Sequence, residues 1–198
     1  MYKRLLIVTF TIICLCAVLT LLPIHGETGV YKNVLRLHVL ANSDSEEDQE
    51  LKLYVRDEIL SVTGELFVDC QSRAEAEQMV IENMVLIQST AEKAISEKGY
   101  DYPVSILLGE EEYPTKNYES ACFPSGEYLS LRVMIGDADG ENWWCVLFPP
   151  MCLGAASSSE AFAEVGFTGE QYNIITETDE PKYKIRFKLL ESIEKAVN

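Results

Sequence analysis

Basic residues are scarce in this chain of 198 residues, which has 16 Lys and Arg against 32 Asp and Glu and a formal net charge of −16 at pH 7. Residues 1–26 hold only two charges, Lys3 and Arg4, so the rest of the chain carries −18. A surface this acidic repels the phosphates of nucleic acids and of anionic lipids. The charge therefore excludes DNA and RNA as binding partners.

Histidine is also rare, with only His25 and His38 in the chain, and no Cys-x-x-Cys pair is present. A tetrahedral zinc site takes its ligands mainly from such cysteine pairs and from imidazoles. A Gly-x-Ser-x-Gly nucleophile elbow is absent as well. The sequence thus predicts no metal site, no other cofactor and no catalytic residue.

One acidic stretch resembles a calcium-binding EF-hand loop in part. Oxygen donors stand at every second position, at Asn42, Asp44, Glu46 and Asp48. The sixth position of such a loop requires glycine and the twelfth a bidentate glutamate, whereas this chain has Glu47 and Leu53 there. Helix capping and solvated acids explain the stretch better than a calcium site.

His38 and the glutamates at residues 110–112 are the remaining candidates for acid–base chemistry. His38 could act as a general base with nearby Asp44, but no nucleophile accompanies it, so a packed or hydrogen-bonded side chain is favoured. The glutamates could supply one acid of a glycosidase pair, but a solvated loop explains them better. A secreted hydrolase that uses His38 and nearby acids stays open as an alternative, as does an extracellular ion- or cell-wall-binding module.

An apolar run of 18 residues, 5–22, follows the two positive charges and ends at Pro23. As a helix it would be about 27 Å long, close to the thickness of a bilayer core. Positive charge before the run places residues 1–4 inside and everything after Pro23 outside. We therefore expect residues 1–26 to be a signal peptide or membrane anchor, and residues 27–198 to be one extracytoplasmic domain.

Export places four cysteines in a compartment where disulfides persist: Cys70, Cys122, Cys145 and Cys152. Four cysteines allow three connectivities. Cys145 and Cys152 could close a small loop, because two prolines at residues 149 and 150 turn the chain between them. Buried thiols that never pair are the alternative.

Hydrophobic periodicity predicts a single α+β domain, in which a mostly antiparallel sheet is covered on one face by two or three helices. Strands are expected at residues 34–40, 102–108, 127–135 and 142–148. A turn signal at residues 137–140 predicts that the last two strands form a hairpin. Residues 109–124 are expected to be a loop, residues 153–181 a variable loop region, and residues 182–188 either strand or helix.

Two helices are predicted from capping signals and apolar stripes. The first begins near Ser43 or Ser45, since both fit a capping box, and continues to about Ser61. Its expected polar side carries Asp48, Lys52 and Arg56, and its apolar stripe is Leu51, Val55, Ile59 and Val62. The second begins at Ser72 and ends at Gly99.

Trp143 and Trp144 are adjacent in an expected strand, so their side chains point to opposite sides. One indole is expected to face the core. The other, beside Asn142, would suit a binding anchor. The alternative is that a loop or a helix covers both rings.

Two dense motifs carry a resemblance to a known family. They are RLHVLANSD at residues 36–44, followed by DQ at 48–49 and VRD at 55–57, and NWWCVLFPPMC at residues 142–152. At these motifs the chain resembles the stage II sporulation protein R family, and the resemblance covers residues 34–152.

The resemblance implies a signalling role. Proteins of this family are made in the forespore and exported into the space between the two membranes around it. There they trigger a membrane-embedded aspartic protease of the mother-cell membrane, which removes the pro-sequence of the sigma-E precursor. The chain would then be a ligand and not an enzyme, associated with a membrane through its N-terminal segment where that segment stays attached.

The resemblance also suggests which residues meet the receptor. The expected contact residues are polar or aromatic members of the two motifs: His38, Asn42, Asp44, Asp48, Gln49, Arg56, Asp57, Asn142, Trp143 and Trp144. Polar groups this dense are costly to bury unless they are paired. Some of them could therefore form an internal network that holds the first strand against the first helix.

Overall fold

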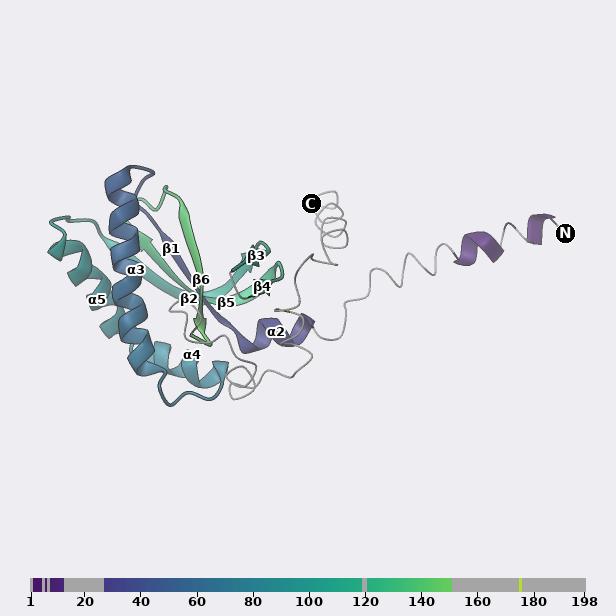
Figure 1. Ribbon diagram of the computed structural model, residues 1–198, viewed down its shortest axis with the longest axis horizontal. Helices are drawn as coiled ribbons and strands as arrows, with labels where there is room; N and C mark the ends of the chain where they lie inside the picture. Colours follow the sequence, from purple (N-terminus) through teal and green to yellow (C-terminus); the bar gives the residue numbers. More distant parts are fainter. Residues whose placement is uncertain are drawn as a thin grey trace.

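The protein is described by a computed structural model that covers residues 2–4, 6, 8–12, 27–118, 121–150 and 175, without the side chains of residues 27–29. Its elements are α2 (Glu27–Asn33), β1 (Leu35–Leu40), α3 (Glu46–Leu66), α4 (Arg73–Glu82), α5 (Met84–Glu97), β2 (Val104–Tyr113), β3 (Lys116–Asn117), β4 (Cys122–Phe123), β5 (Gly126–Ile135) and β6 (Asn142–Phe148). The helices α3, α4 and α5 lie on one side of the sheet, and α2 with the β3–β4 pair lies on the other (Figure 1). The predicted α+β class is confirmed.

The main sheet has the strand order β2-β5-β1-β6. β1 is parallel to β5 and antiparallel to β6, while β2 and β5 are antiparallel. The predicted hairpin of the last two strands is therefore wrong, because β1 lies between them. The connection from β5 to β6 crosses the end of β1, where the Asp139 and Gly140 amides donate to the carbonyls of Asn42 and Ala41.

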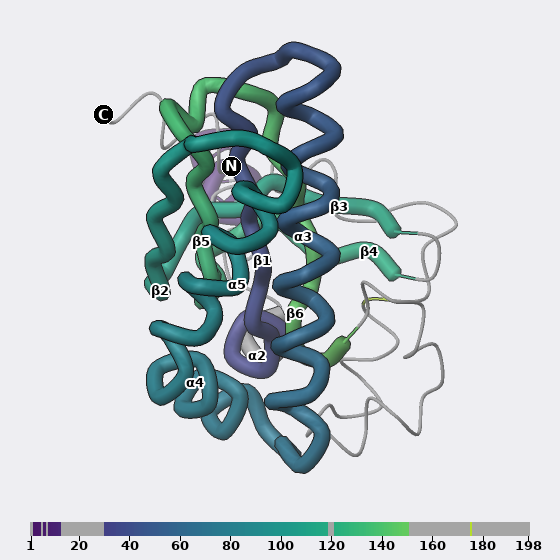
Figure 2. Tube along the Cα trace, turned by 90° about the vertical axis from the view of Figure 1, so that its left-hand side faces the viewer, coloured from purple at the N-terminus to yellow at the C-terminus, as the bar shows by residue number. Residues whose placement is uncertain are grey.

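The main core lies between the sheet and the helices that cover it (Figure 2). β1 contributes Leu35, Leu37 and Val39, each fully buried. The apolar stripe of α3 meets them with Leu51, Val55 and Ile59. Burying one such aliphatic side chain stabilises the fold by about 1.5–3 kcal/mol, so this face holds much of the domain's stability.

The helix α3 begins where a capping signal predicted it and ends later than expected. Ser45 is its N-cap, and the Ser45 hydroxyl accepts a hydrogen bond from the Asp48 amide at 3.2 Å. The helix continues beyond Ser61 to Leu66, with Thr63 buried on the core side and its hydroxyl donating to the Ile59 carbonyl at 2.7 Å. That bond lets a polar residue stay within the buried stripe.

The predicted second helix is divided in two at Asn83. Ser72 caps α4 as expected, and the Glu75 carboxylate accepts from the Gln71 amide. At the end of α4 the Met79 carbonyl accepts from the Asn83 amide at 3.1 Å and from the Asn83 side chain at 2.9 Å. Both parts turn an apolar side to the core: Ala76, Val80, Ile87, Ala91 and Ile95 are buried, and Met79 and Met84 are partly buried.

A second, smaller core covers the face of the sheet opposite α3, α4 and α5. It contains Val30 and Val34 around α2, Phe123 of β4, and Tyr113 and Tyr128 of the sheet. The loop predicted at residues 109–124 is wrong, because β2 continues to Tyr113 and β3 pairs with β4. The three glutamates at residues 110–112 extend β2 along β5, since each is paired in register there.

The predicted disulfide and the regions predicted after residue 152 involve residues that the structure does not describe. Cys145 is disulfide-bonded and Cys70 carries a thiol, whereas Cys152 lies outside the described residues. The regions expected at residues 153–181 and 182–188 lie outside them too, apart from Ile175. Within the described ranges, no helix has the length and apolar character needed to cross a membrane.

Candidate functional site

Four side chains form a row across the face of the sheet opposite α3, α4 and α5, one from each strand. Strand register places Leu107, Arg132, His38 and Trp144 next to one another in that order. Leu107 is 54% exposed at one end, whereas His38 in the centre is 4% exposed. The row exists because β1 carries apolar side chains toward the helices and polar ones to the opposite face.

His38 is held from three sides. Its Nδ1 atom lies 2.9 Å from Glu111 Oε1, and its Nε2 atom lies 2.7 Å from Asn142 Oδ1. The imidazole is stacked on the Trp144 indole, with ring centroids 3.8 Å apart. Both ring nitrogens are thus engaged by side chains of the same domain.

Glu111 is shared between two basic side chains. Its Oε1 atom lies 2.9 Å from an Arg132 terminal nitrogen as well as from His38. Glu111 Oε2 and Arg132 Nε are buried and have no hydrogen-bond partner among the described residues. This polar cluster of His38, Glu111, Arg132 and Asn142 therefore has one unused acceptor and one unused donor in its buried part, while the Arg132 side chain as a whole is 34% exposed.

Arg36 lies two residues before His38 on the same face and is fully buried. Its guanidinium carbon lies 4.3 Å from the ring centroid of Tyr113 and 4.9 Å from that of Tyr128. Its Nε atom donates to the Cys145 carbonyl at 3.1 Å and a terminal nitrogen donates to the Tyr118 hydroxyl at 2.9 Å. No carboxylate pairs with it in the described part of the chain, so aromatic faces and two hydrogen bonds stabilise this charge.

The phenols around Arg36 are shifted away from ionisation. Burial raises the pKa of Tyr113, and the hydrogen bond with Ser130 and the charge of Arg36 oppose that rise without cancelling it. Burial also raises the pKa of Tyr128 and of Tyr118, with Arg36 again opposing. These tyrosines are neutral hydroxyls at physiological pH, which suits them to line a cage around a cation.

A second network joins the end of β1 to the start of α3. Asp48 Oδ2 accepts hydrogen bonds from Asn42 Nδ2 at 2.8 Å and from the Ser43 hydroxyl at 2.6 Å. Burial alone would raise the pKa of Asp48, but the hydrogen bonds from Ser43, Asn42 and Tyr102 lower it below its ordinary value. Asp48, predicted on the polar side of the helix, is in fact 4% exposed.

The same network holds the connection between β5 and β6. Asn42 Oδ1 accepts from the Asp137 amide at 3.0 Å, and Asp44 Oδ1 accepts from the Glu141 amide at 2.7 Å. Gly136 has a φ of +58°, and a Cβ atom there would lie 2.0 Å from Asn42 Oδ1. Only glycine fits this approach, because any side chain would meet the Asn42 amide.

Lys52 completes the second network from α3, one turn after Asp48. Its Nζ atom donates to the Glu141 carbonyl at 2.9 Å and to the Gln49 side chain, and Gln49 Nε2 in turn donates to the Ser43 carbonyl at 2.8 Å. Burial lowers the pKa of Lys52, and the nearby carboxylates of Glu141 and Asp44 oppose that shift. Lys52 was also predicted on the polar side of the helix, and it is 4% exposed.

Trp143 and Trp144 point to opposite sides of β6, as predicted. Trp144 is partly buried against His38, whereas Trp143 is 36% exposed on the helix side. There the Arg56 guanidinium lies 4.3 Å from the Trp143 ring. Arg56 in turn pairs with Asp57, whose carboxylate lies 2.6 Å from its terminal nitrogen.

Comparison with known proteins places these features in a family. The family model for stage II sporulation protein R matches residues 31–158, which is more than half of the chain. This chain belongs to the stage II sporulation protein R family. Stage II sporulation protein R of Bacillus subtilis (strain 168) is 36% identical over 130 residues, which cover 66% of this chain and 58% of that protein. No solved structure matches the chain.

The region shared with the stage II sporulation protein R family contains both networks and the tryptophan pair. The expected contact residues divide within it into two groups. Six are buried or partly buried: His38, Asn42, Asp48, Gln49, Arg56 and Trp144. The other four are exposed: Asp44, Asp57, Asn142 and Trp143.

Four residues of the networks were missed among the expected contact residues: Arg36, Lys52, Glu111 and Arg132. The alternation of β1, with Arg36 and His38 on one face and leucine and valine on the other, was a signal that this face is used. Lys52 follows Asp48 by four residues, which places the two on one side of α3. No signal distinguishes Glu111 from its two neighbours.

Proposed function

We propose that this protein is an exported sporulation signal that activates a membrane-embedded aspartic protease of the mother-cell membrane, which then processes the sigma-E precursor. The observation that carries the proposal is the match to the stage II sporulation protein R family over residues 31–158. The protein acts in the space between the forespore and mother-cell membranes, and its part in the reaction is to bind and not to catalyse.

The two networks support a binding role. The first engages both nitrogens of His38, so the general base of the alternative hydrolase is already occupied. The second uses Asn42, Asp48 and Lys52 to fix two loops against each other. Polar residues used in this way give a rigid surface, and rigidity lowers the entropy cost of binding a partner.

Co-expression of the full chain with the protease and the sigma-E precursor in a bacterium that does not sporulate tests the proposal. Precursor cleavage is expected only when all three proteins are present. A catalytically inactive protease variant provides the control for cleavage by host enzymes. Equal cleavage with and without this chain would overturn the proposal.

The disulfide belongs to the same proposal, because a secreted domain keeps disulfides that the cytoplasm would reduce. Cys145 is disulfide-bonded, and we take Cys152 as its partner because the two prolines between them turn the chain. A non-reduced peptide map of the exported protein should contain a Cys145–Cys152 linked peptide and a Cys70 that reacts with an alkylating reagent. A linked peptide that joins Cys145 to another cysteine contradicts this pairing.

A further inference from the structure

Trp143 is the large aromatic side chain that β6 presents to solvent. It is 36% exposed, while its neighbour Trp144 is stacked on His38. β6 is an edge strand, and Trp143 lies near its start, on the side where α3 packs. A half-exposed indole at an edge is costly to leave in water, and tryptophan is enriched at the energetic centres of protein interfaces.

The indole is held in place before any partner arrives. Arg56 lies over the ring at 4.3 Å, and Asp57 holds Arg56 through its Nε atom at 2.8 Å. On the backbone, Trp143 is paired with Val39 of the central strand. A ring that is covered on one face by Arg56 and carried on a paired strand loses little conformational freedom on binding, so more of its contact energy becomes affinity.

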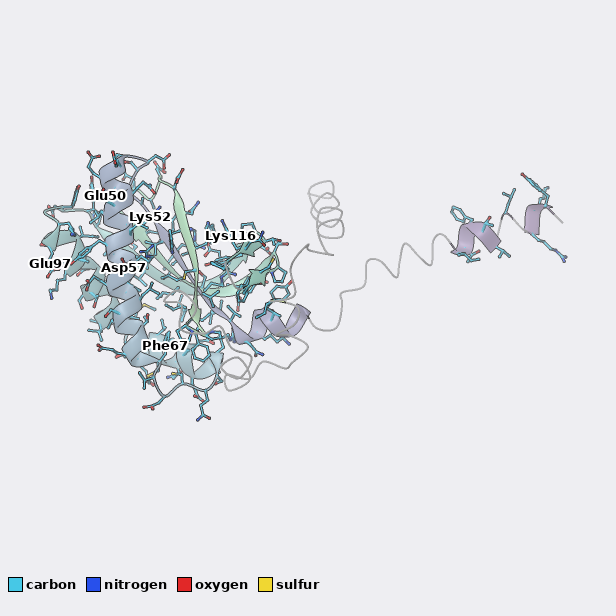
Figure 3. All side chains as sticks on the ribbon, viewed as in Figure 1. Glu50, Lys52, Asp57, Phe67, Glu97 and Lys116 are labelled. Carbon is cyan, nitrogen blue, oxygen red and sulfur yellow. The ribbon has the colours of Figure 1, made fainter. Side chains whose placement is uncertain are left out.

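Three exposed acidic side chains are linked to this indole. Glu141 precedes Trp143 by two residues, Asp44 accepts from the Glu141 amide, and Asp57 of α3 pairs with the Arg56 that lies over the ring. Figure 3 labels Asp57 and Lys52 on α3. Lys52 does not offset this charge toward a partner, since it is 4% exposed and donates to the Glu141 carbonyl. Arg56 is the one basic group counted in the patch and is paired with Asp57, so Asp44 and Glu141 leave the patch with net negative charge beside an aromatic centre, on a chain whose net charge is −16.

We propose that Trp143, Arg56, Asp57, Asp44 and Glu141 form a docking patch that binds a basic segment of the protease, with a lysine or arginine next to an apolar side chain. The apolar side chain packs on the exposed part of the indole, and the basic group meets the acidic rim. This inference rests on the proposed function and names the surface and the partner chemistry. The polar cluster around His38, on the opposite face, then supports β6 without touching the protease.

The test uses the full chain co-expressed with the protease and the sigma-E precursor, with two readouts. One is precursor cleavage, and the other is the amount of the chain that co-purifies with detergent-solubilised protease. Trp143→Ala and Asp57→Lys are the patch variants. Val85→Ala on α5 is the matched control, because Val85 is an apolar residue that is 83% exposed away from the patch.

Trp143→Ala and Asp57→Lys are expected to lower cleavage and co-purification at least about 10-fold, while Val85→Ala behaves as wild type. Co-purification of the wild type should also weaken as NaCl is raised, because the contact includes complementary charges. Circular dichroism and thermal melting of each variant show whether it is folded. A folded Trp143→Ala variant with wild-type cleavage and co-purification overturns the patch and leaves the proposed function intact.

A different result separates the two proposals in the other direction. If the wild-type chain triggers no cleavage, the proposed function fails, and co-purification alone decides on the patch. The patch is supported if the wild-type chain co-purifies with the protease and the Trp143→Ala variant does not. If both chains co-purify equally, or if neither does, the patch is overturned.

Discussion

The imidazole of His38 lies flat against the indole of Trp144, with ring planes 13° from parallel and centroids 3.8 Å apart. The two residues are direct partners across β1 and β6. The stack fastens the edge strand to the central strand through side chains, in addition to the backbone pairing. It also fixes the direction of both tryptophans, because adjacent strand residues point to opposite sides.

Replacing His38 with alanine should destabilise the domain by about 1–3 kcal/mol, since Glu111 and Asn142 would each lose a hydrogen-bond partner in a buried place. Urea unfolding followed by circular dichroism measures the change. Leu107→Ala, in the same row but 54% exposed, should change stability by less than about 0.5 kcal/mol. Equal stabilities for the His38 variant and the wild type contradict the role of the stack.

Arg36→Ala should cost about 2–5 kcal/mol of stability, because it empties the aromatic cage. Arg36→Met, which keeps most of the volume without the charge, should lose clearly less than Arg36→Ala. Thermal and urea unfolding of both variants provide the comparison. If the Arg36→Met variant is less stable than the Arg36→Ala variant, Arg36 does not stabilise the domain by filling the cage.

The stability of the second network should depend on pH through Asp48. The pKa of Asp48 in the folded protein is lower than its ordinary value of 3.8. A carboxyl of this kind stabilises the fold above its unfolded-state pKa, and the contribution is lost as pH falls through the folded-state pKa. The difference in unfolding free energy between wild type and Asp48→Asn should therefore be largest near neutral pH and shrink below about pH 4.

Urea titrations of both proteins between pH 7 and pH 3 measure this difference. Because wild type and Asp48→Asn share all other carboxyls, the effect of those carboxyls on the pH dependence of stability cancels in the difference. A difference that stays constant over the whole range would show that the ionised form of Asp48 is not what the network uses.

Gly136→Ala should destabilise the domain by at least about 1–2 kcal/mol, because its φ is positive and its Cβ would collide with the Asn42 amide. Gly64→Ala is the matched control, since Gly64 lies in α3 with no other atom within 4 Å of its added Cβ. Alanine at Gly64 should stabilise the helix by about 0.5–1 kcal/mol. Opposite signs for the two variants, measured by thermal unfolding, are the expected result.

Local features of the fold were predictable from sequence and non-local ones were not. The cap at Ser45 and the buried stripe of α3 follow from short-range spacing, and the structure has both. The predicted hairpin of the last two strands is wrong, because a turn signal indicates where the chain reverses direction but not which strands pair with each other. The pairing was decided by β1, a strand made about 90 residues earlier.

The candidate site shows the same division. Opposite directions for Trp143 and Trp144 followed from strand periodicity, but the choice of the exposed ring depended on where His38 lies. Asp48 and Lys52 were expected in solvent because charged residues at helical spacing usually are. Lys52 is buried because its amine donates to the Glu141 carbonyl of the β5–β6 connection, and Asp48 is buried because the side chains of Asn42 and Ser43 donate to its carboxylate.

The central position of β1 has a consequence for how the chain is made. Both strands that pair with β1 are synthesised last among the strands described, at Gly126–Ile135 and Asn142–Phe148. Until then β1 has no strand beside it on either side, and the sheet cannot form. A chain that is synthesised with its N-terminus first can therefore complete this sheet only when its last strands arrive.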